Sequence, residues 1–246
     1  MEKKLLKPRN DLVFQKLFGE QKNKEITGHL LSLILGKEVY NVDLDVNKQM
    51  IGKREGLKTC ILDIRAKFND GEDYSKIKPT IAVLITCYKL DEIKEIPRYH
   101  TSWSLREDTE TDAVLTDKFQ VHVLEIPKVK DIEIQTDELA QWMSFINDPE
   151  DGRLEKMMYE NNKYFKQARK ELEYLSGDKD FQEIVEKRAL ALMDQEVQTR
   201  LAKEEGITIE RLEIAKKMKA KNMPIEEIME LTGLSKEEIG KIKIEK

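Results

Sequence analysis

Residues 60–89 read CILDIRAKFNDGEDYSKIKPTIAVLITCYK, and they contain two different strand signals separated by a turn. Apolar and polar side chains alternate over residues 60–68, which is the pattern of a strand with one buried face. Residues 69–71, Asn-Asp-Gly, predict a tight turn because these residue types tolerate a positive φ. Residues 80–88 are apolar almost throughout, which is typical of a central strand covered on both faces. Asp63 is the acidic residue in the middle of the first strand.

Helical signals precede these strands, and further strand signals lie on either side. From residue 10 to residue 36 the apolar residues recur at helical spacing, with Gly19 as a break and Gly36 as a stop. This pattern predicts a helical hairpin or one interrupted helix. Residues 39–46 alternate as a second half-buried strand, and residues 118–126 form another strand closed by Pro127.

Past about residue 135 the strand signals stop, and amphipathic stretches at helical spacing continue to Leu201. The order of elements predicts an α/β fold, a sheet flanked by helices and followed by an all-helical C-terminal tail. We expect an α/β core over residues 1–130, a helical region over residues 131–204 and a C-terminal helical hairpin over residues 205–246.

The C-terminal hairpin is predicted from MPIEEIMELTGLSKEEIGKI, residues 223–242. Two short amphipathic helices are separated by Thr-Gly-Leu-Ser, and Ser235 with Glu238 forms a capping box. A DNA-reading helix-turn-helix has this outline. A hairpin used for packing or oligomerisation is the favoured interpretation, because the second helix is short and mixes Glu237 and Glu238 with its lysines.

Composition indicates a soluble protein of the cytosol, without a membrane span. The 246 residues carry a net charge of -5, 37% charged and 39% hydrophobic residues and two Cys, and no apolar run is long enough to cross a bilayer. Cys60 and Cys87 lie in apolar strand-like runs, which favours reduced core thiols over a disulfide. Neither they nor the three scattered His show zinc-site spacings, so we expect no structural metal.

Several stretches together resemble one known family, the Rpn recombination-promoting nucleases, which are transposase-like proteins of the PD-(D/E)XK nuclease superfamily. The resemblance covers nearly the whole chain. It is carried by the following stretches: KPRNDLVFQKLFGEQKNKEITGHLLSLILG near the N-terminus, LDIRAKFNDG around Asp63, YHTSWSLREDTETDAVLTDKFQVHVLEIPKV after the apolar strand, and DELAQWMSFI, ARKELEYLSGDKDF, RLAKEEG and MPIEEIMELTGLSKEEI in the tail.

The resemblance implies a PD-(D/E)XK nuclease-like mixed sheet and an Mg²⁺-dependent endonuclease whose partner is DNA. In that superfamily one strand supplies an Asp, and the next supplies a Glu followed two residues later by Lys or Gln. Asp63 matches the first position, as catalytic residue and metal ligand. No residue matches the second, because the turn runs straight into GEDYSKIKPTI, and roughly 25 to 30 residues of the family pattern are absent at this point.

Other acidic residues are candidates to complete the site. The resemblance makes Asp11 and Glu25, in the first helical region, candidate auxiliary catalytic acids, although a helix cap or a solvated helix face is the favoured explanation for each. Glu72, just past the turn, is a candidate metal ligand. Glu133-Ile134-Gln135 is a literal E-x-Q, which we interpret as accidental because it lies at the entry to the helical tail.

Two classes of function therefore remain open. The first is an active endonuclease whose second acid comes from another position. The second is a catalytically impaired relative that acts by binding DNA, family relatives or further copies of itself. The apolar stripes of the tail predict a homo-oligomer, and deletion of residues 205–246 is expected to lower its mass.

Overall fold

The computed structural model describes residues 4–39, 59–64, 80–154 and 162–242. They form two compact units, residues 1–188 and residues 189–246. The strand predicted at residues 39–46, the turn at residues 69–71 and the end of the strand at residues 60–68 lie outside the described residues.

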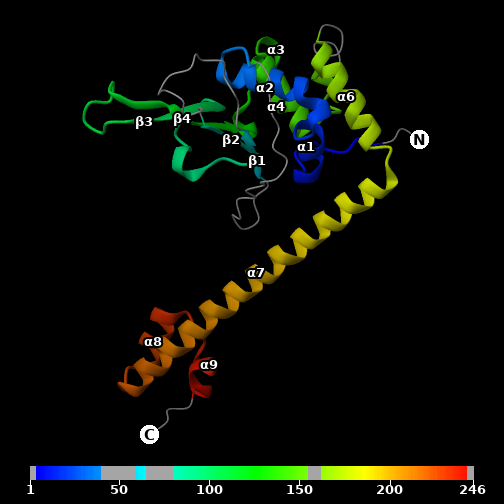
Figure 1. Ribbon diagram of the computed structural model, residues 1–246. Coiled ribbons are helices and arrows are strands. Elements are labelled where there is room, and N and C mark those ends of the chain that lie inside the picture. The colour runs from blue at the N-terminus through cyan, green and yellow to red at the C-terminus, as the bar shows by residue number, and fades with distance from the viewer. Residues whose placement is uncertain (1–3, 40–58, 65–79, 155–161, 243–246) are drawn as a thin grey trace. The chain divides into compact units, whose positions relative to one another are not determined.

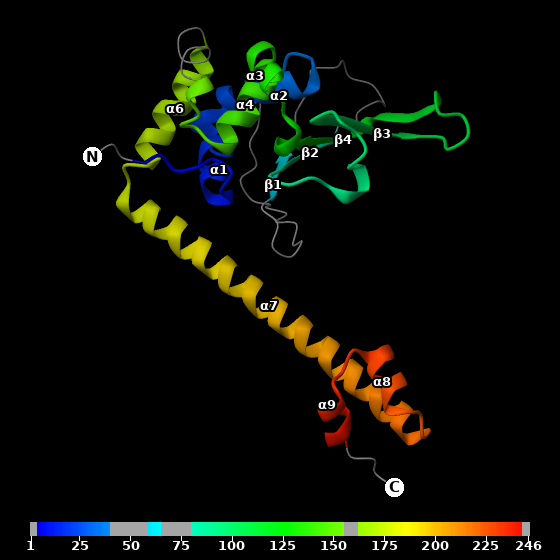
Figure 2. The same cartoon turned by 180° about the vertical axis from the view of Figure 1, so that it is seen from behind.

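The first unit contains a mixed sheet of four strands in the order β1-β2-β4-β3. These are β1 (Thr59–Ile64), β2 (Thr80–Thr86), β3 (His100–Arg106) and β4 (Val114–Glu125). β1 pairs antiparallel with β2, β2 parallel with β4, and β3 antiparallel with β4. Figures 1 and 2 show that the β3–β4 hairpin extends beyond the end of β2. The described parts of the strands predicted at residues 60–68, 80–88 and 118–126 belong to one sheet, and the most apolar one, β2, is central as expected.

The edge strand β3 was not predicted from the sequence. Its residues, HTSWSLR, include only one β-branched side chain and carry a weak strand signal. Backbone pairing with β4 along the length of β3 stabilises the strand in place of strong local strand propensity. Just before the strand, the Tyr99 hydroxyl donates a hydrogen bond to Asp137, and burial raises the pKa of the Tyr99 phenol above its usual range.

The N-terminal helical hairpin consists of α1 (Asp11–Phe18) and α2 (Lys24–Leu35), joined by a short 3-10 turn, η1 (Gln21–Asn23). The Asn10 side chain accepts hydrogen bonds from the first backbone N–H groups of α1, which begins the helix. Gly36 has a φ of 64°, the left-handed conformation that ends helices. The hairpin predicted over residues 10–36 is therefore confirmed.

The remaining helices occupy the C-terminal half of the chain. In the first unit these are α3 (Asp131–Thr136), α4 (Glu138–Asn147) and α6 (Lys163–Leu175), with short 3-10 turns η2 (Asp91–Ile93) and η3 (Ile126–Lys128) before them. α7 (Lys179–Ala220) begins in the first unit and ends in the second. The first of these helices, α3, begins at Asp131. None of the described helices is both long enough and apolar enough to cross a bilayer.

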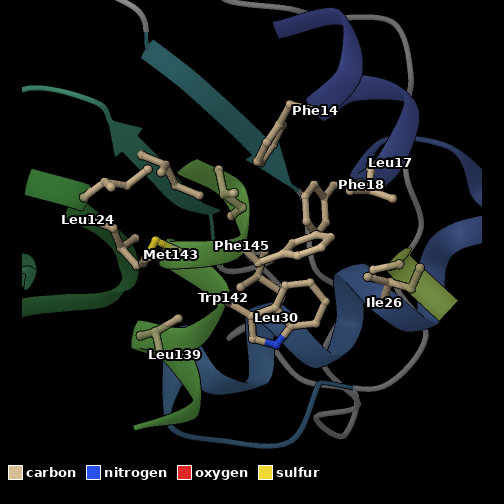
Figure 3. Close-up of a cluster of buried hydrophobic side chains, with 14 of the residues drawn as sticks. Phe14, Leu17, Phe18, Ile26, Leu30, Leu124, Leu139, Trp142, Met143 and Phe145 are labelled. Carbon is tan, nitrogen blue, oxygen red and sulfur yellow. The ribbon is translucent and has the colours of Figure 1, made fainter. Parts of the chain in front are cut away.

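The helices α1, α2, α4 and α6 lie on one side of the sheet (Figures 1 and 2). An apolar core fills the space between these helices and the sheet. Trp142 of α4 is at its centre and is fully buried (Figure 3). Its ring stacks on Phe165 at 3.9 Å and meets Phe18 and Phe145 edge-on at 5.9 and 5.8 Å. One aromatic side chain thus connects α1, α4 and α6.

The second unit has a small core of its own. Its buried members come from the last part of α7, from α8 (Ile225–Thr232), from α9 (Lys236–Lys241) and from the connection between α8 and α9. They are Ala215, Ile228, Leu234 and Ile239. The capping box predicted for the last helix is present. The backbone N–H and the hydroxyl of Ser235 both donate hydrogen bonds to the Glu238 carboxylate.

Replacement of Trp142 by Ala is expected to lower the free energy of unfolding by about 3–5 kcal/mol, because it empties the centre of the aromatic cluster. Urea denaturation followed by circular dichroism measures the change. Trp103→Ala is the matched control, since that ring is 43% exposed and its loss is expected to cost less than about 1 kcal/mol. Equal losses for the two variants would contradict this account of the core.

Candidate active site

Asp63 lies in β1, and its position in the sheet is fixed by the strand register. It pairs with Ala82 of β2, Ala82 pairs with Val121 of β4, and Val121 pairs with Trp103 of β3. These four residues form one row across the sheet. The row is defined by backbone pairing and therefore identifies the immediate neighbours of Asp63.

The two sets of alternating rows differ in burial. Ile81, Val83 and Ile85 of β2 are almost fully buried and belong to the core beneath the helices. In the row of Asp63, Ala82 and Val121 are half-buried and Trp103 is exposed. Asp63 thus belongs, by backbone register, to a row whose described members on β2, β4 and β3 are half-buried or exposed.

The auxiliary acids proposed from the sequence are placed at helix N-termini. Asp11 is the first residue of α1, a helix that contacts β1. One of its oxygens accepts the Leu12 N–H at 2.9 Å, and the other lies 3.5 Å from Arg188. Glu25 is exposed in the first turn of α2, where the helix dipole favours a negative charge. Helix stabilisation accounts for both positions.

The other two acidic motifs have different outcomes. Glu72, the candidate metal ligand, lies outside the described residues. Glu133, from the literal E-x-Q, is in helix α3, where its carboxylate accepts the Lys130 N–H at 2.7 Å. The interpretation of this motif as accidental is confirmed, because it is not on a strand beside Asp63.

A sequence model of PD-(D/E)XK nuclease family transposases matches residues 8–73 and 65–202, which together span most of the chain. The chain belongs to this family. The mixed sheet flanked by helices agrees with the nuclease fold expected for such transposases. No curated protein and no solved structure matches the chain significantly.

Membership of the PD-(D/E)XK family connects the chain with nucleases that act on DNA and typically use divalent metal ions. The match to the family model is divided into two segments that overlap at residues 65–73. This division falls directly after β1.

A divalent metal site in this family needs a second carboxylate close to Asp63, since a hard cation is held by several oxygen ligands at once. The β2 residues next to Asp63 on the same set of rows are Thr80, Ala82 and Leu84, none of which is acidic. Within the described residues, no group of three or more His, Cys, Asp or Glu side chains could hold a metal. The described neighbours of Asp63 therefore do not fit a metal centre.

Glu125, a buried carboxylate at the end of β4, is too far away to complete this site. Its row contains Thr86 and Thr59, so it lies four residues along and two strands across from Asp63, a separation of roughly 16 Å. It forms a buried ion pair with Lys128 instead. The second Glu125 oxygen accepts the Leu90 N–H at 2.8 Å. This pair holds the turn after β2 against the end of β4.

The structure also brings together two His residues that the sequence analysis treated as scattered. His100 Nε2 and His122 Nδ1 are 3.0 Å apart on the neighbouring strands β3 and β4. Burial lowers the pKa of His122 to about 4, helped by the positive charges of His100 and Lys37, and burial also lowers the pKa of His100. The pair is neutral at pH 7 and shares one hydrogen bond between the rings.

Protein stability is expected to fall as the pH is lowered from about 6.5 to 4. His122 has its ordinary pKa in the unfolded chain and a lowered one in the folded chain, so the unfolded state binds more protons in this window. The loss attributable to His122 is on the order of 2 kcal/mol. Urea denaturation at pH 7 and pH 4.5 measures it.

His122→Gln removes the titrating ring and is expected to make stability less dependent on pH over this window. Trp103→Ala is the control, because it removes no titrating group and leaves the His100–His122 pair intact, so it is expected to keep the wild-type dependence. An unchanged pH dependence in His122→Gln would show that the pair does not titrate as described.

Proposed function

We propose that this PD-(D/E)XK family protein is an Rpn-type, recombination-related protein of the cytoplasm that engages DNA but cleaves it poorly. The observation that carries the proposal is the environment of Asp63, whose neighbours on β2 are Thr80, Ala82 and Leu84. The division of the family match at residues 65–73 supports it, because the missing Glu-x-Gln strand would follow β1 at this point.

The size of the expected defect follows from the chemistry of metal-dependent nucleases. In such nucleases a divalent metal ion stabilises the charge that develops on the scissile phosphate and positions the attacking water. We propose Mg²⁺ as the ion for this family. Loss of one such stabilising group typically lowers the rate on the order of a hundred- to a thousandfold. A deletion that removes a carboxylate ligand and its companion polar residue together is expected to cost at least this much.

A second candidate function is an active endonuclease whose second carboxylate comes from outside the described residues. Glu72 is the residue of choice, because it follows β1 closely in the sequence. Asp11 and Glu25 are weaker candidates, since helix stabilisation already accounts for them. This alternative and the impaired nuclease predict opposite results in one assay.

Plasmid cleavage by the purified full-length protein in Mg²⁺ or Mn²⁺ tests the proposal. We expect little nicking, and we expect the same residual rate in wild type and in Asp63→Ala, because an isolated carboxylate does not hold a catalytic metal. Asp91→Ala, which changes an exposed Asp in η2, is the matched control. A parallel gel-shift assay with duplex DNA reports whether binding persists without cleavage.

Robust cleavage that is lost in Asp63→Ala and kept in Asp91→Ala would overturn the impaired-nuclease proposal. Glu72→Gln, Asp11→Asn and Glu25→Gln would then identify the second acid by loss of activity. Absence of both cleavage and DNA binding would overturn the DNA-binding part of the proposal as well.

A further inference from the structure

The middle of helix α7 is solvent-exposed over a long distance. Every residue from 190 to 214 is exposed except Thr199, which is partly buried. Most of the stability of a helix within a protein comes from packing of its apolar face, and Gly206 within the segment lowers helix stability further. A helical segment of this kind is normally stabilised by packing against a partner.

Four large apolar residues form a continuous stripe in the first half of this segment. Leu190, Met193, Val197 and Leu201 are 61%, 58%, 43% and 50% exposed. Their spacing of three, four and four residues places them on one face of an α-helix, and eleven residues complete three turns. The stripe ends where Glu204 occupies the next position of the pattern.

The core of the second unit does not use this stripe. Its buried residues from α7 begin at Ala215, which packs with Ile228, Leu234 and Ile239. The buried apolar side chains of α8 and α9 thus have partners within the unit, whereas Leu231 of α8 is 64% exposed. Residues 190–201 are therefore the segment of this unit that we consider for self-association. They precede residues 205–246, whose deletion was expected from the sequence to lower the mass of the oligomer.

The charges beside the stripe are arranged asymmetrically. On a helical wheel of about 100° per residue, Asp194 and Glu205 lie along one edge of the stripe together with Lys187, and Arg200 and Arg211 lie along the other together with Glu204. In a parallel pair of helices, opposite edges face each other, and a residue meets the one five positions further along the partner. Arg200 then faces Glu205 of the second copy, twice in each pair.

We propose that α7 pairs in parallel and in register with α7 of a second copy of this chain, along Leu190, Met193, Val197 and Leu201. The pairing buries the exposed stripe and joins two chains by an isologous contact. It gives the proposed binding role a defined partner, and its tests require neither metal nor DNA cleavage.

Cysteine cross-linking of the full-length protein tests the geometry. Val197→Cys is expected to form a disulfide-linked dimer under mild oxidation, because a seam residue of a parallel pair meets its own counterpart. Leu192→Cys, on the opposite side of α7, is the matched control and is expected to stay monomeric. The unmodified chain, with its own Cys60 and Cys87, gives the background. Equal cross-linking of the two variants, or none at Val197→Cys, would overturn the proposal.

Charge exchange tests the pairing independently of oxidation, with mass measured by light scattering. Arg200→Glu and Glu205→Arg are each expected to shift the protein toward monomer, because each places like charges across the seam. An equimolar mixture of the two variants is expected to recover the dimer, since each substituted position then faces the opposite charge on the other chain. A monomeric wild type, or a mixture that stays monomeric, would contradict the parallel seam.

Discussion

The structure of the first unit depends on the burial of β2 between two neighbouring strands. Its side chains Ile81, Val83 and Ile85 are withdrawn from water beneath the helices, while its backbone is hydrogen-bonded to β1 on one edge and β4 on the other. A strand with this composition must have partners along both edges and cover on its apolar face. The register of the sheet, and hence the position of Asp63, follows from these pairings.

The same pairings explain why family membership and catalytic competence can be separated. A nuclease fold is maintained by the core around Trp142 and by the pairing of β2, neither of which requires a metal site. The metal site requires particular oxygen atoms on adjacent strands, and β2 offers Asp63 only Thr80, Ala82 and Leu84 in the described sheet. The fold would therefore tolerate the loss of a metal ligand, because the strands pair through their backbones.

Polar groups inside the first unit stabilise its architecture. Glu125 and Lys128 neutralise each other at the end of β4 and hold the turn after β2. His100 and His122 share a hydrogen bond between β3 and β4 and remain neutral. The second unit differs, because α7 exposes apolar side chains to water that the core of this unit does not cover. The polar pairs of the first unit form because burial removes these groups from water. The proposed pairing of α7 would likewise remove its apolar stripe from water.

The elements that the sequence predicted correctly are those specified by residues close together in the chain. Asn10, Gly19 and Gly36 mark the ends of α1 and α2, the apolar run marks β2, and Ser235 with Glu238 caps α9. The edge strand β3 was missed because its residues have weak strand propensity and pairing with β4 holds it in place. The His100–His122 contact and the surroundings of Asp63 likewise depend on strand register, which joins residues about twenty apart in the chain. Local propensity and capping act over a few residues and can be recognised from the sequence, whereas cross-strand contacts arise only when the sheet has formed, so the tertiary structure decided them.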